Sequence, residues 1–356
     1  MGSNNKEKVI VGMSGGVDSS VAAALLVRQG YRVTGVTMKT GDDGGTAHTG
    51  GCFGSGQQEG IESARRVAAK LGIPYHVIDV AGEFKHQVLD FFCREYMSGN
   101  TPNPCVRCNK LVKFGALWEK ALAGGLEADY MASGHYARVE LDGSGRYLLK
   151  KGRDGKKDQS YFLYGLTQGQ LARTLFPLGG YLKQEVRKLC VDLELGVETR
   201  TESQDFAGGD YAALFAGKAV PGQVVDKQGN VLGTHKGVVY YTRGQRRGLS
   251  LASKEPLYVI DIRADTNSVV VGSLEELYTE KQIVDDLNWI APRSLNGPVE
   301  ITARIRSSHK GYAAVVAPLE NGKALVTYKE PQVGAARGQS IVFYEGDVVV
   351  GGGIVE

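Results

Sequence analysis

Long apolar runs, proline and an excess of charge of one sign are all scarce in this chain of 356 residues. No stretch approaches the roughly 18 apolar residues that a membrane-spanning helix needs, and the start of the chain does not have the pattern of a signal or transit peptide. We therefore expect a cytosolic protein without membrane contacts. The 10 prolines and the ordinary 42% share of hydrophobic residues exclude a disordered or low-complexity chain. A net charge of only +3 gives no global reason to expect nucleic acid or membrane as a partner.

Cysteine is sparse as well, and its five copies are Cys52, Cys93, Cys105, Cys108 and Cys190. In a reducing compartment such residues serve as thiols, metal ligands or redox groups rather than as structural disulfides. The chain has one CxxC, from Cys105 to Cys108, and lacks the second CxxC or histidine pair that a structural zinc site requires. Cys93 and Cys190 each share a helical face with apolar residues, so we expect both to pack in a core.

Glycine, by contrast, is abundant, with 49 of the 356 residues, about twice the usual share of roughly 7%. Such a chain favours many tight turns and sites lined by backbone. In the first half, strand-like and helical patterns alternate, which predicts βαβ units and a parallel sheet. The expected strands are residues 9–13, 32–38, 74–80 and 128–133, and the expected helices are 19–29, 62–71, 83–97, 114–123, 160–175 and 184–195.

The pattern changes near residue 202, where short β-branched runs separated by turn residues replace the helices. Strands are expected at residues 237–241, 257–262, 269–271, 299–305, 312–317, 324–328, 340–344 and 347–350, with Asn321-Gly322 as a hairpin turn. The fold class is therefore α/β, with a parallel-sheet domain followed by a small mixed domain and a C-terminal β-barrel. We place the domains at residues 1–207, 208–280 and 281–356.

The sequence Ser14-Gly15-Gly16-Val17-Asp18-Ser19-Ser20 lies between the first expected strand and the first expected helix. Glycines let the backbone approach a ligand closely, and the helix dipole together with the serine hydroxyls favours an anion, such as the phosphates of a nucleotide. The loop is not a Walker A motif, because no Lys-Ser/Thr follows the glycines, and it is not a GxGxxG motif. The alternative is a tight turn in which Asp18 or Ser19 caps the helix.

The CxxC stands in the segment Asn103-Pro104-Cys105-Val106-Arg107-Cys108-Asn109-Lys110. The cations Arg107 and Lys110 beside Cys108 favour its thiolate, the form of a cysteine that carries or delivers sulfur. The alternative is a pair of incidental thiols in a loop.

Local charge departs from the balanced total. Residues 143–157 and residues 227–247 each carry a net charge of +5, and a third group of cations, with no acid among them, is Arg304, Arg306 and Lys310. Aromatic residues interleave with these cations, a combination typical of RNA-binding surfaces; they are Tyr240, Tyr241 and Tyr312. For any one segment the alternative is an ordinary solvated face.

Several of these segments also resemble motifs of known enzymes. SGGVDSS at residues 14–20 resembles the PP-loop of the ATP pyrophosphatase superfamily, whose members cleave ATP between the α- and β-phosphates and adenylate an oxygen of their substrate. The motifs that follow it are TPNPCVRCNKLVKF (101–114), ASGHYAR (132–138), KKDQSYFL (156–163), GQVVDKQGNVLGTHKG (222–237) and YTRGQRRGL (241–249). Together, and over essentially the whole chain, they resemble the tRNA-specific 2-thiouridylases, which use ATP to replace O2 of the wobble uridine with sulfur.

The resemblance implies ATP and Mg²⁺ as cofactors and assigns roles to particular residues. Asp18 would help to hold Mg²⁺ and pyrophosphate, and the nucleotide would contact Gly12, Met13, Ser14, Gly15, Gly16, Val17, Asp18, Ser19, Ser20, Met38 and Gly134. Cys108 matches the family's nucleophile. The tRNA and its target base would contact Asn103, Pro104, Cys105, His135, Lys157, Asp158, Gln159, Arg306, Ser307 and Gln339. Taken alone, His135 is equally a loop residue with satisfied hydrogen bonds.

The chain departs from the family at one point. Members usually carry a second catalytic cysteine after a Ser-Gln-(Asp/Glu) stretch, but no cysteine lies between residues 191 and 356, although Ser203-Gln204-Asp205 is present. Three alternatives stay open. Cys105 resolves the persulfide of Cys108 as a disulfide; or Cys105, Cys108 and Cys52 bind an iron–sulfur cluster such as [4Fe-4S] that carries the sulfur; or the chain binds tRNA and thiolates it poorly.

The resemblance thus leads to the hypothesis of an ATP-dependent tRNA-uridine 2-sulfurtransferase that releases AMP and pyrophosphate. Its partners would be tRNA and an upstream sulfur-donor protein, and it would act as a monomer. One alternative is another PP-loop adenylating ligase, but amidation needs no thiol and the CxxC argues against it. The other is a tRNA-binding or sulfur-carrier protein without catalysis.

Overall fold

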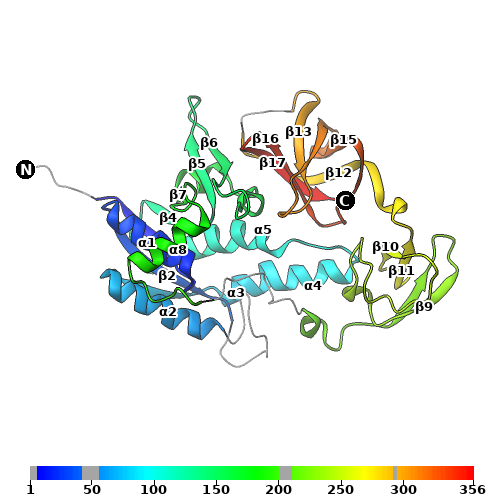
Figure 1. Ribbon diagram of the computed structural model, residues 1–356, viewed down its shortest axis with the longest axis horizontal. Helices are drawn as coiled ribbons and strands as arrows, with labels where there is room; N and C mark the ends of the chain where they lie inside the picture. Colours follow the sequence, from blue (N-terminus) through cyan, green and yellow to red (C-terminus); the bar gives the residue numbers. More distant parts are fainter. Residues whose placement is uncertain (1–5, 42–55, 201–210, 292–294) are drawn as a thin grey trace, which may run out of the picture.

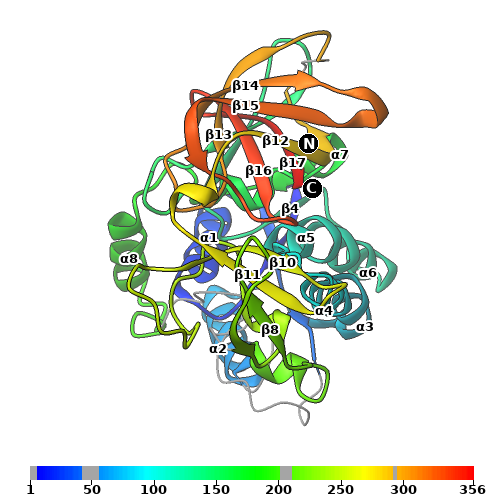
Figure 2. The same ribbon diagram turned by 90° about the vertical axis from the view of Figure 1, so that its right-hand side faces the viewer.

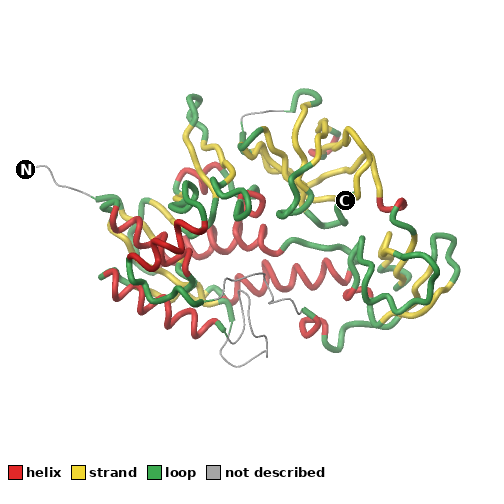
Figure 3. Tube along the Cα trace, viewed as in Figure 1, coloured by secondary structure: helices red, strands yellow, loops and turns green. Residues whose placement is uncertain are grey.

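The computed structural model describes residues 6–41, 56–200, 211–291 and 295–356 (Figure 1). A parallel sheet with helices on both faces is followed along the chain by a small mixed sheet and a closed antiparallel barrel. The expected α/β class with a C-terminal β-barrel is therefore confirmed. Helices gather around the parallel sheet, whereas the other two regions are built mainly from strands and loops (Figure 3).

The parallel sheet has the strand order β3-β2-β1-β4-β7. Its strands are β1 (Lys8–Gly12), β2 (Arg32–Lys39), β3 (Tyr75–Asp79), β4 (Tyr130–Ala132) and β7 (Thr174–Leu175). Val9 and Val11 pack into one core and Ile10 into the other, as the period of two along a strand dictates. The strand order reverses between β1 and β4, and ligands of such sheets bind at the carboxyl ends of the strands near this point.

Helices cover both faces of this sheet. On one face, α1 (Val17–Arg28), α2 (Gln57–Leu71) and α8 (Lys183–Asp192) share a core. On the other face lie two long helices, each with a π turn in its middle (Figure 1). The first is α3 (Ala81–Phe84), η1 (Lys85–Leu89) and α4 (Asp90–Met97), and the second is α5 (Pro104–Cys108), η2 (Asn109–Ala116) and α6 (Leu117–Ala123).

Two expected helices differ from those observed. The helix expected from residue 114 begins at Pro104, because Asn103 caps it and Pro104 occupies its first turn. The single helix expected over residues 160–175 is wrong. This stretch forms a 3₁₀ turn η3 (Ser160–Leu163), the short α7 (Gln168–Ala172) and then β7, because Thr167 and Gln170 form a capping box that starts a new helix.

The small mixed sheet has the order β10-β11-β8-β9. Its strands are β8 (Gly222–Val225), β9 (Val231–His235), β10 (Tyr258–Arg263) and β11 (Ser268–Gly272), preceded by the 3₁₀ turn η4 (Ala212–Phe215). The strand expected at 237–241 is wrong, because η5 (Val238–Tyr240) is a 3₁₀ turn that follows Gly237 with φ of 147°. η5 packs against α4, so the long helix reaches from the parallel sheet to the mixed sheet (Figure 1). In Figure 2 this helix is seen nearly end-on, and the mixed sheet faces the viewer.

The barrel has the strand order β12-β15-β14-β13-β16-β17 and closes by pairing of β12 with β17. Its strands are β12 (Tyr278–Trp289), β13 (Val299–Arg304), β14 (Tyr312–Pro318), β15 (Ala324–Val333), β16 (Ser340–Glu345) and β17 (Val348–Val355). The 3₁₀ turn η6 (Glu275–Leu277) precedes β12, and η7 (Glu320–Gly322) joins β14 to β15. In η7, Asn321 and Gly322 have φ of 59° and 73°, which confirms the expected hairpin.

The first region is hydrogen-bonded to the barrel. Its hairpin, β5 (Ala137–Leu141) and β6 (Tyr147–Lys151), extends the barrel sheet, because Lys150 of β6 pairs with Val348 of β17. The barrel is thus tied to the part of the chain that follows β4. In the described part of the chain, no helix has the length and hydropathy that a membrane crossing requires.

Candidate active site

The glycine loop joins the carboxyl end of β1 to α1 and rests on the start of α2. Gly15 has φ of 77°, a left-handed conformation that favours glycine. A Cβ on Gly15 would lie 2.3 Å from the carbonyl oxygen of Gly60, and the Ser63 hydroxyl donates a hydrogen bond to the Gly15 carbonyl at 2.9 Å. The contact between the loop and α2 therefore leaves no room for a side chain at position 15.

The serines of the loop hold its shape. The amide of Ser14 donates to Oγ of Ser19 at 3.1 Å, and the hydroxyl of Ser20 donates to the carbonyl of Gly16 at 2.8 Å. Gly16 is the N-cap of α1 and no side chain caps this helix, so a cap by Asp18 or Ser19 is not observed. Helix amides that no side chain caps, at the positive end of the dipole, attract an anion.

Asp18, in the first turn of α1, has hydrogen-bond partners on both carboxylate oxygens. The ammonium of Lys183 lies 2.7 and 2.8 Å from them, and the hydroxyl of Tyr136 donates to one of them at 2.8 Å. The side chain of Lys183 is 8% exposed and that of Asp18 is 30% exposed. Lys183 was not expected at this site, because it lies 165 residues from Asp18 in the sequence. The available signal was a lysine at the first position of a helix, where the dipole disfavours a cation.

The other residues expected at the nucleotide surround the same edge of the sheet. Gly134 follows β4, and a Cβ there would lie 2.8 Å from the backbone of Asp18 and of Ser19. Met38 lies near the carboxyl end of β2, where its carbonyl accepts a hydrogen bond from the Gln57 amide at 3.4 Å. The structure thus places residues 12–20, Met38 and Gly134 at the carboxyl edge of the parallel sheet.

The two cysteines of the CxxC lie on α5. Asn103 accepts a hydrogen bond from the amide of Val106 at 3.3 Å and so fixes the start of this helix. Cys105 is half-buried and Cys108 is 4% exposed. Positions i and i+3 lie on one face of a helix, so the two thiols belong to the same side of α5.

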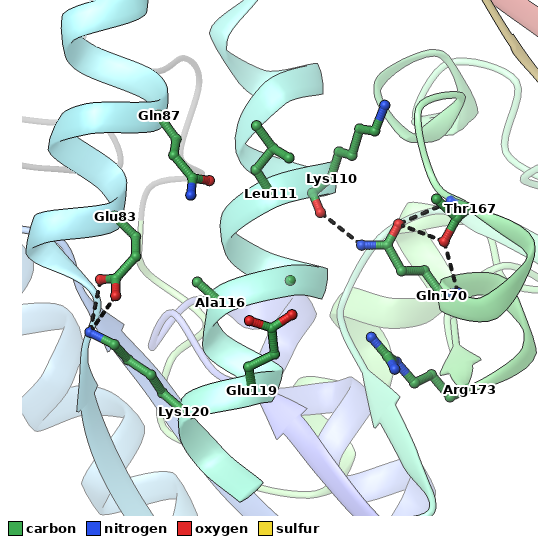
Figure 4. Close-up of a pocket in the computed structure, with 11 residues that line it drawn as sticks. Glu83, Gln87, Lys110, Leu111, Ala116, Glu119, Lys120, Thr167, Gln170 and Arg173 are labelled. Atoms are coloured by element: carbon green, nitrogen blue, oxygen red, sulfur yellow. Dashed lines mark hydrogen bonds and ion pairs between the residues drawn. The ribbon is translucent and has the colours of Figure 1, made fainter. Parts of the chain in front are cut away.

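The cations beside Cys108 in the sequence contact neighbouring elements. The guanidinium of Arg107 stacks 4.0 Å from the ring centre of Phe91, and its Nε donates to the carbonyl of Gln87 at 2.5 Å. Desolvation by burial lowers the pKa of Arg107. Lys110 lines a pocket between helices (Figure 4). Stabilisation of a Cys108 thiolate by these cations stays a prediction.

The pocket in Figure 4 has a volume of about 460 Å³ and lies between the two long helices and α7. Gln170 of α7 anchors its wall, because its amide nitrogen donates to the carbonyls of Lys110 and Phe114 in η2, at 2.7 and 3.1 Å. The pocket is lined by none of the residues expected to bind the nucleotide. Gln170 thereby contacts the π turn that begins directly after Cys108.

His135, expected near the target base, joins the end of β4 to this π turn. Its ring centre lies 6.1 Å from that of Phe114 and 5.9 Å from that of Phe176, and its Nδ1 lies 2.7 Å from the hydroxyl of Ser133. Burial first, and then the charge of Lys113, lower the pKa of His135 well below its usual 6.5. The imidazole is therefore neutral at pH 7.

Asp158 and Gln159, expected to contact tRNA, have partners inside the protein. The carboxylate of Asp158 accepts hydrogen bonds from two backbone amides and forms an ion pair of 2.6 Å with Arg304 of β13. These two side chains are 3% and 8% exposed. The side chain of Gln159 accepts a hydrogen bond from the amide of Tyr136 at 2.9 Å. This segment therefore links the barrel to the loop that carries His135 and Tyr136.

Three more of the expected tRNA contacts lie on the barrel. The amide nitrogen of Gln339 donates to the carbonyl of Thr101 at 2.8 Å. This bond ties the barrel to the segment just before α5, which we call the cysteine helix. The carbonyl of Ser307 accepts a hydrogen bond from Arg304. Arg306 is exposed.

Many cations of the basic segments are held by internal contacts. In residues 143–157, Lys150 and Arg153 form ion pairs with acidic residues at 2.9 and 3.2 Å. In residues 227–247, Arg243 donates to three backbone carbonyls that belong to the mixed sheet, to η6 and to the segment after β15. These cations hold regions of the protein together.

Other cations of these segments stay exposed. In the second and third of these segments, those that form no ion pair with a described residue are Lys236, Arg246, Arg247, Arg306 and Lys310. Arg306 Nη2 lies 4.0 Å from the position that a Cβ on Gly244 would take, so the turn that holds Arg246 and Arg247 adjoins the barrel turn that holds Arg306. We call these five residues the basic surface.

The remaining cysteines are as expected or lie outside the described residues. Cys190 is fully buried in the core of α1 and α8, and Cys93 packs half-buried against the other core, which confirms both expectations. Burial first, and then Glu198, raise the pKa of Cys190 to about 11. Cys52, a proposed cluster ligand, lies outside the described residues, among which no group of three metal-binding side chains occurs.

Comparison with known proteins gives matches over nearly the whole chain. Three family models match in succession: a tRNA methyl transferase HUP domain over residues 7–207, a tRNA methyl transferase PRC-barrel domain over 213–273 and an aminomethyltransferase beta-barrel domain over 279–355. The tRNA-specific 2-thiouridylase MnmA 1 of Clostridium botulinum (strain Hall) is 47% identical over 99% of both chains. MnmA 2 of Clostridium tetani is also 47% identical over 99% of both. A solved 4-thiouridine synthetase–RNA complex with bound ATP covers 59% of this chain and 49% of that chain, with 15% identity and a TM-score of 0.35, a similarity too low to bear on function.

Proposed function

The chain belongs to the family of tRNA-specific 2-thiouridylases and is a tRNA sulfurtransferase, and we propose that it uses ATP to replace O2 of the wobble uridine with sulfur. The resemblance carried by the sequence motifs is thereby confirmed. The family models are named for methyl transfer and the relatives for thiolation, and the paired cysteines of α5 favour sulfur as the group transferred. The observation that carries the proposal is this cysteine helix, which η2 and His135 connect to the edge of the sheet where the glycine loop lies.

The first half-reaction takes place at the glycine loop. The amides of α1 bind the phosphates of ATP, and O2 of the uridine attacks the α-phosphorus. The bond from the α-phosphorus to the bridging oxygen breaks, pyrophosphate leaves and the uridine carries an adenylate on O2. Asp18 and the hydroxyls of Ser14, Ser19 and Ser20 are hard oxygen donors of the kind that Mg²⁺ prefers, and they would hold this ion. Bound there, Mg²⁺ supplies neutralisation of the charge on the departing pyrophosphate.

The second half-reaction uses the thiols of α5. A sulfur-donor protein transfers a sulfane sulfur to Cys108, and the terminal sulfur of this persulfide attacks C2 of the uridine, so that AMP leaves with the former O2. The thiolate of Cys105 then attacks Sγ of Cys108. The sulfur–sulfur bond to the base breaks and 2-thiouridine leaves, while Cys105 and Cys108 form a disulfide. A thiol reductant returns two electrons to this disulfide before the next turnover.

An iron–sulfur cluster is the alternative carrier of sulfur. Such a cluster is held by cysteine thiolates, usually four of them. The described residues supply only Cys105 and Cys108 on α5, and Cys52 lies outside them. The described residues alone do not form a cluster site, so we assign no step to one.

The basic surface would receive the tRNA. Its five cations lie on the mixed sheet and the barrel, and the barrel reaches the cysteine helix through Gln339 and Thr101. Phosphates bound at the basic surface would orient the tRNA while the anticodon reaches α5. The proposal is completed by three domains (1–207, 208–280 and 281–356), a monomeric state, a cytosolic location and a separate sulfur-donor protein.

Nucleoside mass spectrometry tests the proposed function directly. Incubation of the protein with tRNA, Mg·ATP and a persulfide donor should yield 2-thiouridine, with AMP and pyrophosphate in equal amounts. Cys108→Ser should form no 2-thiouridine and still release pyrophosphate in the presence of tRNA. Cys93→Ser, the matched control in the core, should keep full activity. Formation of 2-thiouridine by Cys108→Ser would overturn the assignment of the nucleophile.

The carrier of sulfur is decided by two further measurements. Under single turnover with the persulfide route, Cys105→Ser should stop at a covalent link between Cys108 and tRNA, visible on a non-reducing gel. Iron and sulfide analysis after anaerobic purification should then give no stoichiometric cluster. A stoichiometric cluster that is lost in Cys52→Ala would replace the persulfide route by the cluster route.

A further inference from the structure

Lys183 is a nearly buried ammonium at the edge of the glycine loop. Its side chain is 8% exposed, its Nζ lies 2.7 and 2.8 Å from the two oxygens of Asp18, and it stands 5.9 Å from the ring centre of Tyr136. Withdrawing an ammonium from water costs several kcal/mol, and anionic groups beside it offset that cost. Lys183 is also the first residue of α8, where the helix dipole disfavours a cation.

The partner of Lys183 lies where a polyphosphate would bind. Asp18 stands in the first turn of α1, beside the helix amides that no side chain caps, and 30% of its side chain is exposed. A bare carboxylate in this place would repel the phosphates of ATP. The carboxylate of Asp18 and the phosphates can therefore lie here together only with a cation beside them. The Tyr136 hydroxyl holds one oxygen of Asp18 independently at 2.8 Å, so Asp18 keeps its orientation without Lys183.

We propose that Lys183 is a phosphate-binding residue that exchanges partners. It pairs with Asp18 in the absence of nucleotide, turns to the polyphosphate when ATP binds, and thereby releases Asp18 for Mg²⁺. An ammonium has three donors on a flexible stem and can make this change by rotation of its side chain. ATP and Mg²⁺ then favour each other's binding, because each takes one member of the ion pair. The inference rests on the proposed use of ATP.

Calorimetric titration of ATP in the presence of EDTA, without tRNA, tests the inference. Lys183→Met should weaken metal-free binding at least tenfold, which corresponds to about 1.4 kcal/mol. The matched control is Lys188→Met, which removes an exposed lysine from the same helix and should bind as the wild type does. Equal affinity of Lys183→Met and wild type would overturn the inference and leave Lys183 as a clamp between α1 and α8.

Asp18→Asn is a second variant, which keeps the inference testable if Lys183→Met does not fold. It keeps Lys183 and removes its carboxylate partner, so metal-free ATP should bind more tightly than to the wild type and Mg²⁺ should no longer strengthen binding. Metal-free binding no tighter than in the wild type would count against the exchange of partners. A wild-type protein that binds no ATP at all would instead overturn the proposed function, so the two failures are distinguishable.

Discussion

At the scale of single residues, the position of the glycine loop requires that residue 134, in the loop after β4, has no side chain. A Cβ on Gly134 would lie 2.8 Å from backbone atoms of Asp18 and Ser19 and would push the first turn of α1 away. We expect Gly134→Ala to raise the KM for ATP in pyrophosphate release by about tenfold or more, because small displacements at such sites are costly. Gly180→Ala, at a position with open space around it, should leave this KM unchanged, and a normal KM in Gly134→Ala would show that the contact relaxes.

His135 makes the stability of the protein depend on pH. Burial and Lys113 hold the pKa of His135 well below 6.5 in the folded chain, whereas the unfolded chain has a pKa of about 6.5. Below that pH the unfolded chain binds a proton that the folded chain does not, so the free energy of unfolding falls as pH drops.

The pH profile of a variant isolates this effect. We expect His135→Asn to remove up to about 1.4 kcal/mol per pH unit from the slope between about pH 6.5 and 5, measured by urea unfolding. Above about pH 7 the curves of variant and wild type should run parallel. The other histidines with lowered pKa, His235 and His309, remain in both proteins and cancel in the difference. Equal slopes below pH 6.5 would contradict the prediction.

At the scale of elements, the cysteine helix depends on a side chain from α7. The amide of Gln170 donates to the carbonyls of Lys110 and Phe114, and Gln170→Leu would leave both without this donor, at a cost of about 1–3 kcal/mol. We expect the free energy of unfolding to fall by that amount and amide hydrogen exchange to speed up over residues 104–123. Gln184→Leu, exposed on α8, is the matched control. Unchanged exchange in Gln170→Leu would mean that η2 keeps its register alone.

The same elements show what local sequence can predict. The alternating strand and helix patterns were enough to predict the parallel sheet, and Asn321-Gly322 was enough to predict a hairpin. Both features have local causes in the sequence. Asn103-Pro104 is a helix-start signal that our reading overlooked. Gln170 reaches the π turn η2 from another helix, and the long β12 is bulged where it pairs with each of two different strands. These features come from tertiary contacts that no short window contains.

The candidate site divides in the same way. The glycine loop and the CxxC are contiguous motifs, so both were recognised in the sequence, although the helix that carries the two cysteines was not. Lys183 and Tyr136 reach Asp18 from 165 and 118 residues away, and Arg304 reaches Asp158 across 146 residues. Nothing in a single sequence pairs such residues, which is why Asp158 was expected to contact tRNA and the structure gives its carboxylate a buried partner.

At the scale of the whole molecule, that buried ion pair holds the first region to the barrel. Asp158 and Arg304 are 2.6 Å apart with side chains 3% and 8% exposed. We expect Asp158→Asn and Arg304→Met each to lower the free energy of unfolding by about 3–5 kcal/mol, since each leaves a buried charge unpaired. The double variant should lose less than the sum of the two, and a double-mutant cycle by urea unfolding measures the difference. A coupling energy near zero would contradict a direct interaction.

The basic surface joins two regions of the molecule, and its use by tRNA has a signature in salt dependence. Neutralising two cations that contact phosphates should reduce the slope of log K against log salt concentration by about 1.4–1.8. We expect this change both for Arg246→Gln with Arg247→Gln on the mixed-sheet side and for Arg306→Gln with Lys310→Gln on the barrel side.

The two changes should add, because one tRNA would cover both turns, which adjoin at Gly244 and Arg306. Lys227→Gln is the matched control, since this exposed lysine already pairs with Glu276 at 3.3 Å and its loss should leave the slope nearly unchanged. ATP binding should stay normal in every variant, because none of these cations lies at the carboxyl edge of the parallel sheet. If only one of the two pairs changed the slope, the tRNA would contact one region alone, and the shared surface would have to be abandoned.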